Sequence, residues 1–341
     1  MMLEQTIDPN PVIQLIEAFR TSKAMFVAVS LGVFDRLEKG AASLKGLASD
    51  LGCEIDPLER LLDACVGLKL LRIHDAAYSN EPVASVYLCR SSPNTLVGYI
   101  LYSNEVLYPL WSHLENAVRH GGHQWKQISG QEGGIFDQFF QTRAAMRTFL
   151  KGMHGFGVLS SPLVVAAFDL TRFRLFVDLG GATGHSAIAV CERYPQMKAI
   201  IFDLPDVIDT VRDDVSRTPV ASRIELMKGD MFDPAQIPEA DLFGLSRILH
   251  DWSDEKVKAL LEGVHKRLKP GGGILIAEKL LAEDKTGPVS AQMQSLNMLV
   301  CTEGKERTLG EYWTLLEAAG FTDVRGQITG APLDAVFAIK A

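Results

Sequence analysis

Residues 177–185 have the sequence Val177-Asp178-Leu179-Gly180-Gly181-Ala182-Thr183-Gly184-His185. They end an apolar run, Leu175–Leu179, that predicts a buried strand, and they precede a segment, 186–194, that predicts a helix. Glycine lets the backbone turn tightly and lets a ligand approach it closely. In an open parallel sheet this kind of turn lies at the carboxyl edge, where ligands bind. We therefore predict an α/β fold in which this stretch is a ligand-binding loop, with a plain strand-to-helix turn as the alternative.

The chain from residue 169 to residue 341 alternates strand-like and helical patterns, which is typical of a parallel sheet with crossover helices. Four more strands are predicted, at Ala199–Phe202, Ile224–Met227, Leu242–Leu245 and Gly273–Ala277. Two late strands, Val324–Ile328 and Ala335–Ile339, have no room for a crossover helix between them, so we expect them to pair antiparallel. The sequence thus predicts a doubly wound, mostly parallel, seven-stranded sheet in a domain of residues 169–341.

Residues 1–168 predict a separate and mostly helical domain. Ser43 is a candidate N-cap for a helix that ends at Gly52, and Asp56 is a candidate N-cap for the next helix. The segment 70–79 has the pattern of a short hairpin. Helix, helix and hairpin in this order predict a winged helix, followed by longer, aromatic-rich helices.

The bulk composition limits the class of protein. A length of 341 residues allows two domains, and 47% hydrophobic with 22% charged residues is ordinary for a folded, cytoplasmic protein. The net charge of −8 disfavours a nucleic-acid partner. The five cysteines have no CxxC spacing, which indicates reduced thiols and neither disulfides nor a zinc site. We expect no metal ion. The sequence contains no run of about 18 apolar residues, so it predicts no membrane span.

Acidic residues follow the next two predicted strands. Asp203, followed by Leu204, ends the second strand, where a carboxylate can accept hydrogen bonds from both hydroxyls of a ribose. The alternative is a cap on the helix that starts at Pro205. Gly229-Asp230-Met231 ends the third strand, where the carboxylate can bind an adenine amino group and the methionine can lie against the ring. A simple turn is the alternative there.

The fourth predicted strand is followed by Ser246-Arg247-Ile248-Leu249-His250-Asp251-Trp252. The ordinary pKa of histidine suits a general base near neutral pH. A phenol, with a pKa of about 10, becomes a good nucleophile only when a base takes its proton. The second ring nitrogen of such a histidine needs a carboxylate to hold the tautomer. We predict His250 as this base and Glu278 and Glu306 as the carboxylates, with a buried structural histidine as the alternative.

The segment Met293–Met298 predicts part of a helix that could face the same edge of the sheet. Asn297 together with Met293 and Met298 suits an adaptable apolar pocket with one orienting polar group. A core helix with a buried asparagine is the alternative. The aromatic residues between Tyr99 and Phe140 favour a flat aromatic substrate.

In this combination and order, the segments resemble the class I S-adenosylmethionine-dependent O-methyltransferases of the caffeate and acetylserotonin type. The resemblance spans nearly the whole chain. It is carried by Leu249-His250-Asp251-Trp252, Ser295-Leu296-Asn297-Met298-Leu299-Val300, Thr302-Glu303-Gly304-Lys305-Glu306-Arg307 and Leu31-Gly32-Val33-Phe34-Asp35. It implies a Rossmann-like methyltransferase domain and an N-terminal winged-helix domain that forms a homodimer. It also implies S-adenosylmethionine as cofactor, S-adenosylhomocysteine as its product, and a small hydroxylated aromatic substrate of secondary metabolism.

The resemblance implies roles for single residues. Predicted cofactor contacts are Asp178, Gly180, Gly181, Gly184, Asp203, Leu204, Gly229, Asp230, Met231 and Arg247. Predicted substrate contacts are Asp251, Asn297, Met293, Met298 and Phe140. His250 is implied as the base, flanked by Glu278 and Glu306. The chain departs from the family pattern at Ala182, where glycine is common, and at Phe140 and Gly157, where the acetylserotonin enzymes carry Tyr and Trp. Ala182 is expected to be a small change that does not abolish cofactor binding, whereas Phe140 and Gly157 predict a roomier pocket and a different substrate.

Other classes of function are weighed against this one. A winged-helix, ligand-sensing regulator is disfavoured by the net charge of −8 and by the acidic residues of the candidate recognition helix, 58–68. A nicotinamide-dependent dehydrogenase is disfavoured because the glycine loop does not have the spacing GxGxxG. A methyltransferase that acts on nitrogen or carbon is a further alternative, and His250, Glu278 and Glu306 favour oxygen.

Overall fold

The computed structural model describes residues 7–131, 133–139 and 142–341. The chain forms two compact units, Met1–Val106 and Leu107–Ala341, and each has its own core. This boundary lies well before the one expected at 168/169. The reason is that α11 (Arg143–Ala166) packs against α12 (His185–Arg193) and α13 (Pro205–Ser216), so the helices after residue 106 belong to the second unit.

The first unit contains the predicted winged helix. Its elements are α1 (Asn10–Leu31), α2 (Val33–Glu38), β1 (Ala42–Ser43), α3 (Leu44–Leu51), α4 (Ile55–Gly67), β2 (Leu71–His74), β3 (Ala77–Asn80), α5 (Pro82–Tyr87) and α6 (Val97–Tyr102). The hairpin β2–β3 is antiparallel, and β1 pairs with β3. Ser43 caps α3 by accepting from Gly46 N at 3.3 Å, and α3 ends at Gly52, as predicted. The prediction for Asp56 was wrong, because α4 begins at Ile55 and Asp56 lies in its first turn.

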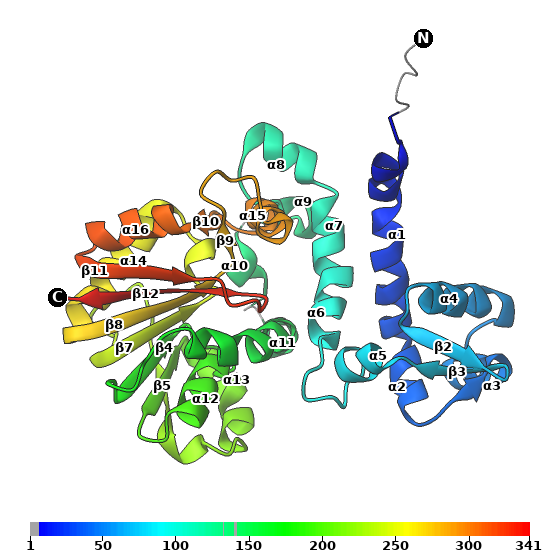
Figure 1. Ribbon diagram of the computed structural model, residues 1–341, viewed down its shortest axis with the longest axis horizontal. Helices are drawn as coiled ribbons and strands as arrows, with labels where there is room; N and C mark the ends of the chain where they lie inside the picture. Colours follow the sequence, from blue (N-terminus) through cyan, green and yellow to red (C-terminus); the bar gives the residue numbers. More distant parts are fainter. Residues whose placement is uncertain (1–6, 132, 140–141) are drawn as a thin grey trace, which may run out of the picture. The chain divides into compact units, whose positions relative to one another are not determined.

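The second unit contains the predicted seven-stranded sheet (Figure 1). The strands are β4 (Leu175–Leu179), β5 (Lys198–Asp203), β6 (Ile224–Lys228), β7 (Ala240–Ser246), β8 (Leu268–Glu278), β11 (Phe321–Gln327) and β12 (Asp334–Lys340). Their order is β11-β12-β8-β7-β4-β5-β6. The five strands β4 to β8 are parallel, and β12 pairs antiparallel with both β8 and β11, as the short connection predicts. The fold is therefore the predicted mostly parallel, doubly wound α/β sheet.

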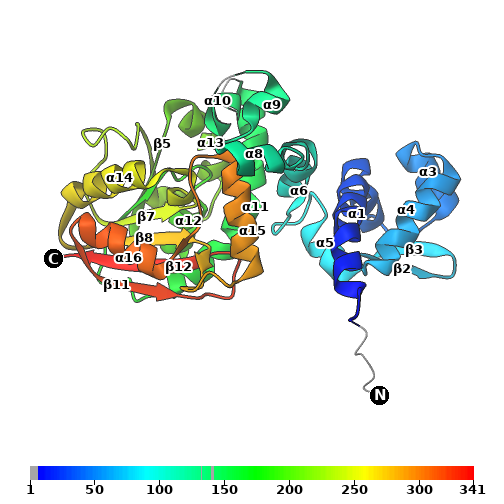
Figure 2. The same cartoon turned by 90° about the horizontal axis from the view of Figure 1, so that it is seen from above.

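Helices cover both faces of this sheet because neighbouring strand residues point to opposite sides. Phe176 of β4 lies in the core under α11, α12 and α13, whereas Val177 lies in the core under α14 and α16. The π-helix η1 (Ser103–Leu107) contains the boundary between the two units. The remaining elements of the second unit are α7 (Tyr108–Trp111), α8 (Leu114–His120), α9 (Trp125–Ser129), α10 (Ile135–Phe139), η2 (Ala221–Arg223), η3 (Leu249–Asp251), α14 (Asp254–Arg267), β9 (Leu280–Leu281), α15 (Val289–Cys301), β10 (Arg307–Thr308) and α16 (Leu309–Ala318). Helix α15 packs against α7 and α8, and Figure 2 shows it beside α8.

Helix α11 is, among the described residues, the one helix long and apolar enough to cross a membrane by length and composition. Its buried side chains, which include Met146, Leu150 and Val164, lie in the same core cluster as residues of α12 and α13. That packing is typical of a core helix. We therefore describe α11 as the central helix on one face of the sheet.

Candidate functional site

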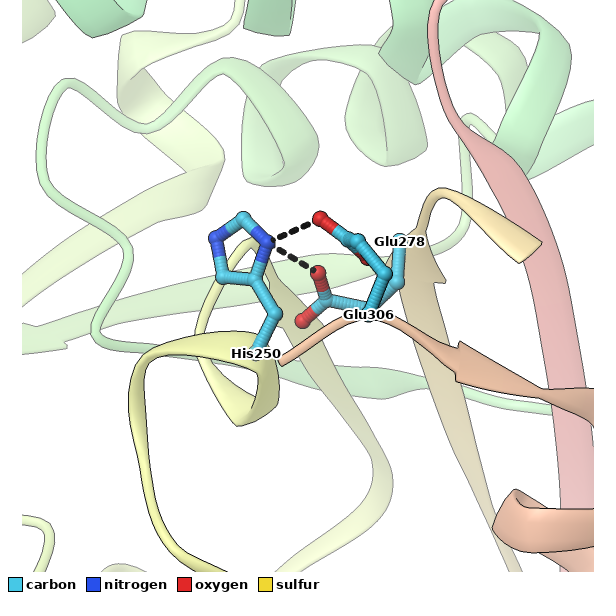
Figure 3. A group of neighbouring side chains, drawn as sticks. All are labelled: His250, Glu278 and Glu306. Carbon is cyan, nitrogen blue, oxygen red and sulfur yellow. Dashed lines mark hydrogen bonds and ion pairs between the residues drawn. The ribbon is translucent and has the colours of Figure 1, made fainter. Parts of the chain in front are cut away.

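His250 lies directly after β7, in the short 3₁₀ turn η3, with 2% of its surface exposed. Its Nδ1 lies 2.6 Å from Glu306 Oε1 and 3.2 Å from Glu278 Oε2 (Figure 3). Glu278 ends β8, the neighbour of β7 in the sheet, and Glu306 immediately precedes β10. The fold thus brings together the three residues predicted as base and carboxylates, which are far apart in the sequence.

Glu278 also holds the backbone beside the histidine. Its Oε1 accepts hydrogen bonds from Ile248 N and Leu249 N, both at 3.0 Å. Its other oxygen faces the imidazole. Glu278 therefore fixes the start of the turn that carries His250, while Glu306 makes the shorter contact with the ring.

The buried carboxylates control the proton on His250. Burial by itself lowers the pKa of His250, but the negative charges of Glu278 and then Glu306 outweigh burial and raise that pKa to about 9. Burial raises the pKa of Glu278 to about 7, although His250 opposes the shift. These side chains share protons as one coupled cluster, and the extra proton is held most strongly on the imidazole.

The same three side chains could hold a metal ion, because their ligand atoms lie within 4.8 Å of one another. The 2.6 Å between His250 Nδ1 and Glu306 Oε1, however, is a hydrogen-bond distance. Two ligands that each lie about 2.0–2.1 Å from one ion stand roughly 3 Å apart. The geometry fits a proton between the two atoms better than a metal.

The glycine loop 180–184 is built for close contact. Gly180 and Gly184 have φ of 69° and 74°, a region that favours glycine. A Cβ on Gly180 would lie 2.6 Å from Ile248 Cδ1 and 3.7 Å from Met231 Sδ, and one on Gly184 would lie 2.2 Å from Ile201 Cδ1. The loop, Met231 and the residues after β7 therefore meet in one place.

Asp203 faces this loop from the end of β5. Its Oδ2 accepts from Ala182 N at 2.8 Å and its Oδ1 from Leu204 N at 2.7 Å. The described contacts at the start of α13 include no side-chain cap, which rules against the alternative that Asp203 caps this helix. Burial raises the pKa of Asp203 to about 6, and the two N–H donors oppose that shift.

Two of the predicted cofactor contacts lie behind the loop. Asp178 is 1% exposed, and its Oδ2 accepts from Ala187 N in the first turn of α12 at 3.1 Å. Burial raises its pKa to about 8. A Cβ on Gly181, which is also buried, would lie 2.8 Å from Asp178 O. Asp178 and Gly181 thus shape the loop from behind.

The segment after β6 combines a tight turn with an open carboxylate. Gly229 is buried, and a Cβ there would lie 2.3 Å from the ring of Phe202. Asp230 is exposed and accepts from Phe232 N at 2.8 Å. The turn proposed as the alternative is therefore present, and it holds Asp230 at the surface beside half-buried Met231. Leu204 is 38% exposed.

Helix α11 supplies neighbours that the sequence did not single out. Arg247, with φ of 55°, places Nη1 3.2 Å from Met153 Sδ and its guanidinium over the ring of Phe156. His154 Nδ1 lies 2.9 Å from Thr183 Oγ1 in the glycine loop. Ser161 Oγ of the same helix lies 2.8 Å from Nδ1 of His185, the first residue of α12.

Gly157 makes room for the first residue of α12. A Cβ on Gly157 would lie 2.1 Å from His185 Cδ2, so the imidazole occupies the space that a side chain at 157 would need. Burial first, and then the charges of His154 and Arg247, lower the pKa of His185 to about 3, so this ring is neutral. A glycine in the middle of a long helix was the one available sequence signal for this packing.

The structure brings only some of the predicted substrate residues close to His250 or buries them. Asp251 Oδ1 lies 3.7 Å from His250 Nε2, and burial raises the pKa of Asp251. Asn297 and Met298 on α15 are 9% and 4% exposed, whereas Met293 is 45% exposed. Asn297 Oδ1 accepts from Trp111 Nε1 at 2.8 Å. Phe140, also predicted, lies outside the described residues.

Known proteins resemble this chain over nearly its whole length. The model of the O-methyltransferase domain family matches residues 111–322, and that of the O-methyltransferase dimerisation domain matches residues 13–90. Acetylserotonin O-methyltransferase of Gallus gallus is 42% identical over 97% of this chain and 97% of that protein. A probable bifunctional dTTP/UTP pyrophosphatase/methyltransferase protein of Homo sapiens is 41% identical over 98% of this chain and 55% of its own length.

Solved structures agree with these relatives. The crystal structure of human N-acetylserotonin methyltransferase in complex with SAM has a TM-score of 0.94 and 37% identity, and covers 99% of this chain and 100% of that one. The structure of PigF with SAH has a TM-score of 0.87 and 28% identity, and covers 98% and 100%. With its matching domains, its fold and its paired-carboxylate histidine, the chain belongs to the O-methyltransferase family.

Proposed function

We propose that the chain, as an S-adenosylmethionine-dependent O-methyltransferase, methylates a hydroxyl group of a small aromatic metabolite, with His250 as the general base. The observation that carries the proposal is the 2.6 Å contact between His250 Nδ1 and Glu306 Oε1. When Nδ1 carries the proton that Glu306 accepts, Nε2 is left as the acceptor. That nitrogen can then take the hydroxyl proton of the substrate.

The residues around the glycine loop fit S-adenosylmethionine, which supplies an electrophilic methyl group on a sulfonium. A side chain on Gly180 would fill the space beside Met231 and Ile248, so glycine keeps that space open. Asp203 offers a half-buried carboxylate for a ribose, and Asp230 an exposed one for an adenine amino group. Arg247, which follows β7 directly, places its guanidinium over the ring of Phe156 on α11.

The positive sulfonium has a consequence for His250. A cation bound near the site disfavours the imidazolium form and lowers the pKa of His250 from the value of about 9 in the ligand-free protein. The cluster of His250, Glu278 and Glu306 is thereby expected to release a proton when the cofactor binds. Cofactor binding thus favours the neutral base that must deprotonate the hydroxyl.

The acceptor substrate is best sought among aromatic compounds with a second polar group. Trp111 Nε1 is a donor only, so it fixes Oδ1 of Asn297 as its acceptor. Nδ2 of Asn297 is consequently the side of the amide that can donate to an oxygen on the substrate. A hydroxyindole with an amide or carbonyl oxygen has this combination, and it is our first candidate.

We further propose that the first unit forms a homodimer through α1. Val12, Ile13, Leu15, Ile16 and Phe19 of this helix are between 45% and 77% exposed. Exposed apolar surface of this kind marks an interaction site, and the region matches the O-methyltransferase dimerisation domain. Sedimentation should show a dimer that Phe19→Asp dissociates and Gln14→Asp, on the same helix, does not. A monomeric parent protein would contradict this part of the proposal.

The activity is tested by transfer of a labelled methyl group from S-adenosylmethionine to hydroxyindoles, catechols, flavonoids and hydroxylated polyketides. We expect label in at least one O-methyl product. Thermal shift with S-adenosylhomocysteine and with NAD provides a second test, because a ligand that binds only the folded state raises the melting temperature. Stabilisation by NAD alone, or label only on nitrogen or carbon, would contradict the proposal.

A further inference from the structure

Arg307 is a buried cation that the proposed mechanism does not use. Its side chain is 1% exposed, and its neighbour along the chain is Glu306, the carboxylate that contacts His250. A buried charge is unfavourable unless it is paired and hydrogen-bonded. The contacts that satisfy Arg307 therefore indicate what it does.

The guanidinium of Arg307 bonds to both ends of the turn that carries His250. Nη1 donates to Leu249 O at 2.9 Å, immediately before the histidine, and Nη2 donates to Trp252 O at 3.0 Å, two residues after it. Nε and Nη2 donate to Asp254 Oδ1 at 3.0 and 2.7 Å, which anchors the fork at the start of α14. Nη1 also reaches Lys305 O at 3.3 Å.

The residues just before Arg307 contact the same turn. The backbone of Gly304 is in close contact with the turn that carries His250. A Cβ on Gly304 would lie 2.3 Å from His250 O and 2.6 Å from Trp252 N. Glu303 Oε1 accepts from Ser253 N at 3.2 Å. The segment 303–307 thus holds the turn by side chains and by close backbone contact, and it holds the imidazole itself through Glu306.

We infer that segment 303–307 is a clamp that sets the position of His250, with Arg307 as its principal positioning residue. The inference rests on the proposed role of His250 as base. The planar, five-donor guanidinium reaches three carbonyls and one carboxylate at once. A lysine at this position keeps the charge but cannot span both ends of the turn. Displacement of a catalytic group by about 1 Å can lower the rate by about 10²-fold.

The test compares Arg307→Lys with Lys258→Ala, a change at an exposed lysine of α14 that lies outside the clamp. We expect Arg307→Lys to lower kcat by about 10- to 100-fold. Binding of S-adenosylhomocysteine, measured by calorimetry, should stay within about twofold. The ascending limb of the pH–rate profile should move to lower pH, because a looser turn weakens the contact between His250 and Glu306. Lys258→Ala should change none of these quantities.

A second variant keeps the result decisive if Arg307→Lys does not fold. Gly304→Ala retains Arg307, and its methyl group must push the turn away from His250 O. It should give the same fall in kcat and the same shift of the pH profile. A folded Arg307→Lys or Gly304→Ala with the kcat and pH profile of Lys258→Ala would overturn the clamp. So would a parallel loss of cofactor affinity.

The failure of the clamp can be separated from the failure of the base. If His250→Ala is impaired while Arg307→Lys and Gly304→Ala are not, the base stands and the clamp alone is wrong. If His250→Ala turns over at the full rate, the proposed base is wrong and the clamp falls with it.

Discussion

Replacing Glu306 with glutamine removes one negative charge from beside His250 Nδ1 and leaves the shape of the side chain almost unchanged. The two contacting atoms are 2.6 Å apart, and the charges, spread over both groups, are separated by roughly 4 Å. Two unit charges at that distance interact by about 4 kcal/mol at an effective dielectric constant of about 20. Since each pKa unit corresponds to about 1.36 kcal/mol, the pKa of His250 should fall by up to about 3 units. Glu278 remains 3.2 Å from the same nitrogen and limits the change.

The direction of the pH effect follows from the role of the base. His250 works only when it is deprotonated, so the rate rises as the pH rises through its pKa, which is raised to about 9 in the ligand-free protein. In Glu306→Gln the ascending limb should therefore lie at lower pH. The plateau should fall by at least about 10²-fold, because the base is weaker and glutamine can also donate to Nδ1 and favour the wrong tautomer.

The assay is the initial rate of methyl transfer at saturating cofactor, from about pH 5.5 to about pH 10. Glu317→Gln is the matched control, because it makes the same chemical change at an exposed side chain of α16 that lies outside the clamp. Superimposable profiles for the two variants would refute the electrostatic argument.

Three further changes test the cofactor side of the site. Asp203→Asn removes the charged acceptor of Ala182 N–H, and hydrogen bonds to charged groups contribute about 1.5–3 kcal/mol. Calorimetry should therefore show that the variant binds S-adenosylhomocysteine at least about 10-fold more weakly. Equal binding by the variant and the wild type would contradict this role. Ala182→Gly relieves a φ of 46° and should raise the free energy of unfolding by up to about 1 kcal/mol in denaturant titration; a loss of stability would show that the loop is not strained. Gly157→Ala places a Cβ 2.1 Å from the His185 ring and should cost about 1–3 kcal/mol of stability, whereas an unchanged melting temperature would mean that the ring has room to move.

The strands, and the residues that lie at their carboxyl ends, were predictable because their sequence patterns are local. Apolar runs that end in Gly180, Asp203, Gly229 or His250 mark the carboxyl ends of four parallel strands, and such ends meet at one edge of a sheet. The alternatives left open at single residues needed the structure. Asp203 could have capped α13, and the two interpretations are separated only by the structure, in which the start of α13 has no side-chain cap and Asp203 Oδ2 accepts from Ala182 N at 2.8 Å.

Features that depend on tertiary packing were missed or misplaced. No local sequence pattern indicates to which unit the helices after residue 106 belong. Their place in the second unit follows from the contacts of α11 with α12 and α13. The contact of His185 with Ser161 links two helices and is likewise invisible in a linear pattern. The N-cap prediction at Asp56 failed because α4 begins one residue earlier, at Ile55. Ala182, expected to be a small change, adopts a backbone conformation that favours glycine.

The most direct test of His250 as base compares wild type and His250→Ala on a series of acceptors that differ in the pKa of the methylated hydroxyl. An acceptor that is already ionised needs no base, whereas one with a pKa of about 10 does. The account predicts that His250→Ala binds S-adenosylhomocysteine normally and loses about 10²- to 10⁴-fold in rate on the weakly acidic acceptors, with the loss shrinking as the hydroxyl becomes more acidic. A loss that is the same for every acceptor, or no loss at all, would contradict the assignment of His250 as the general base.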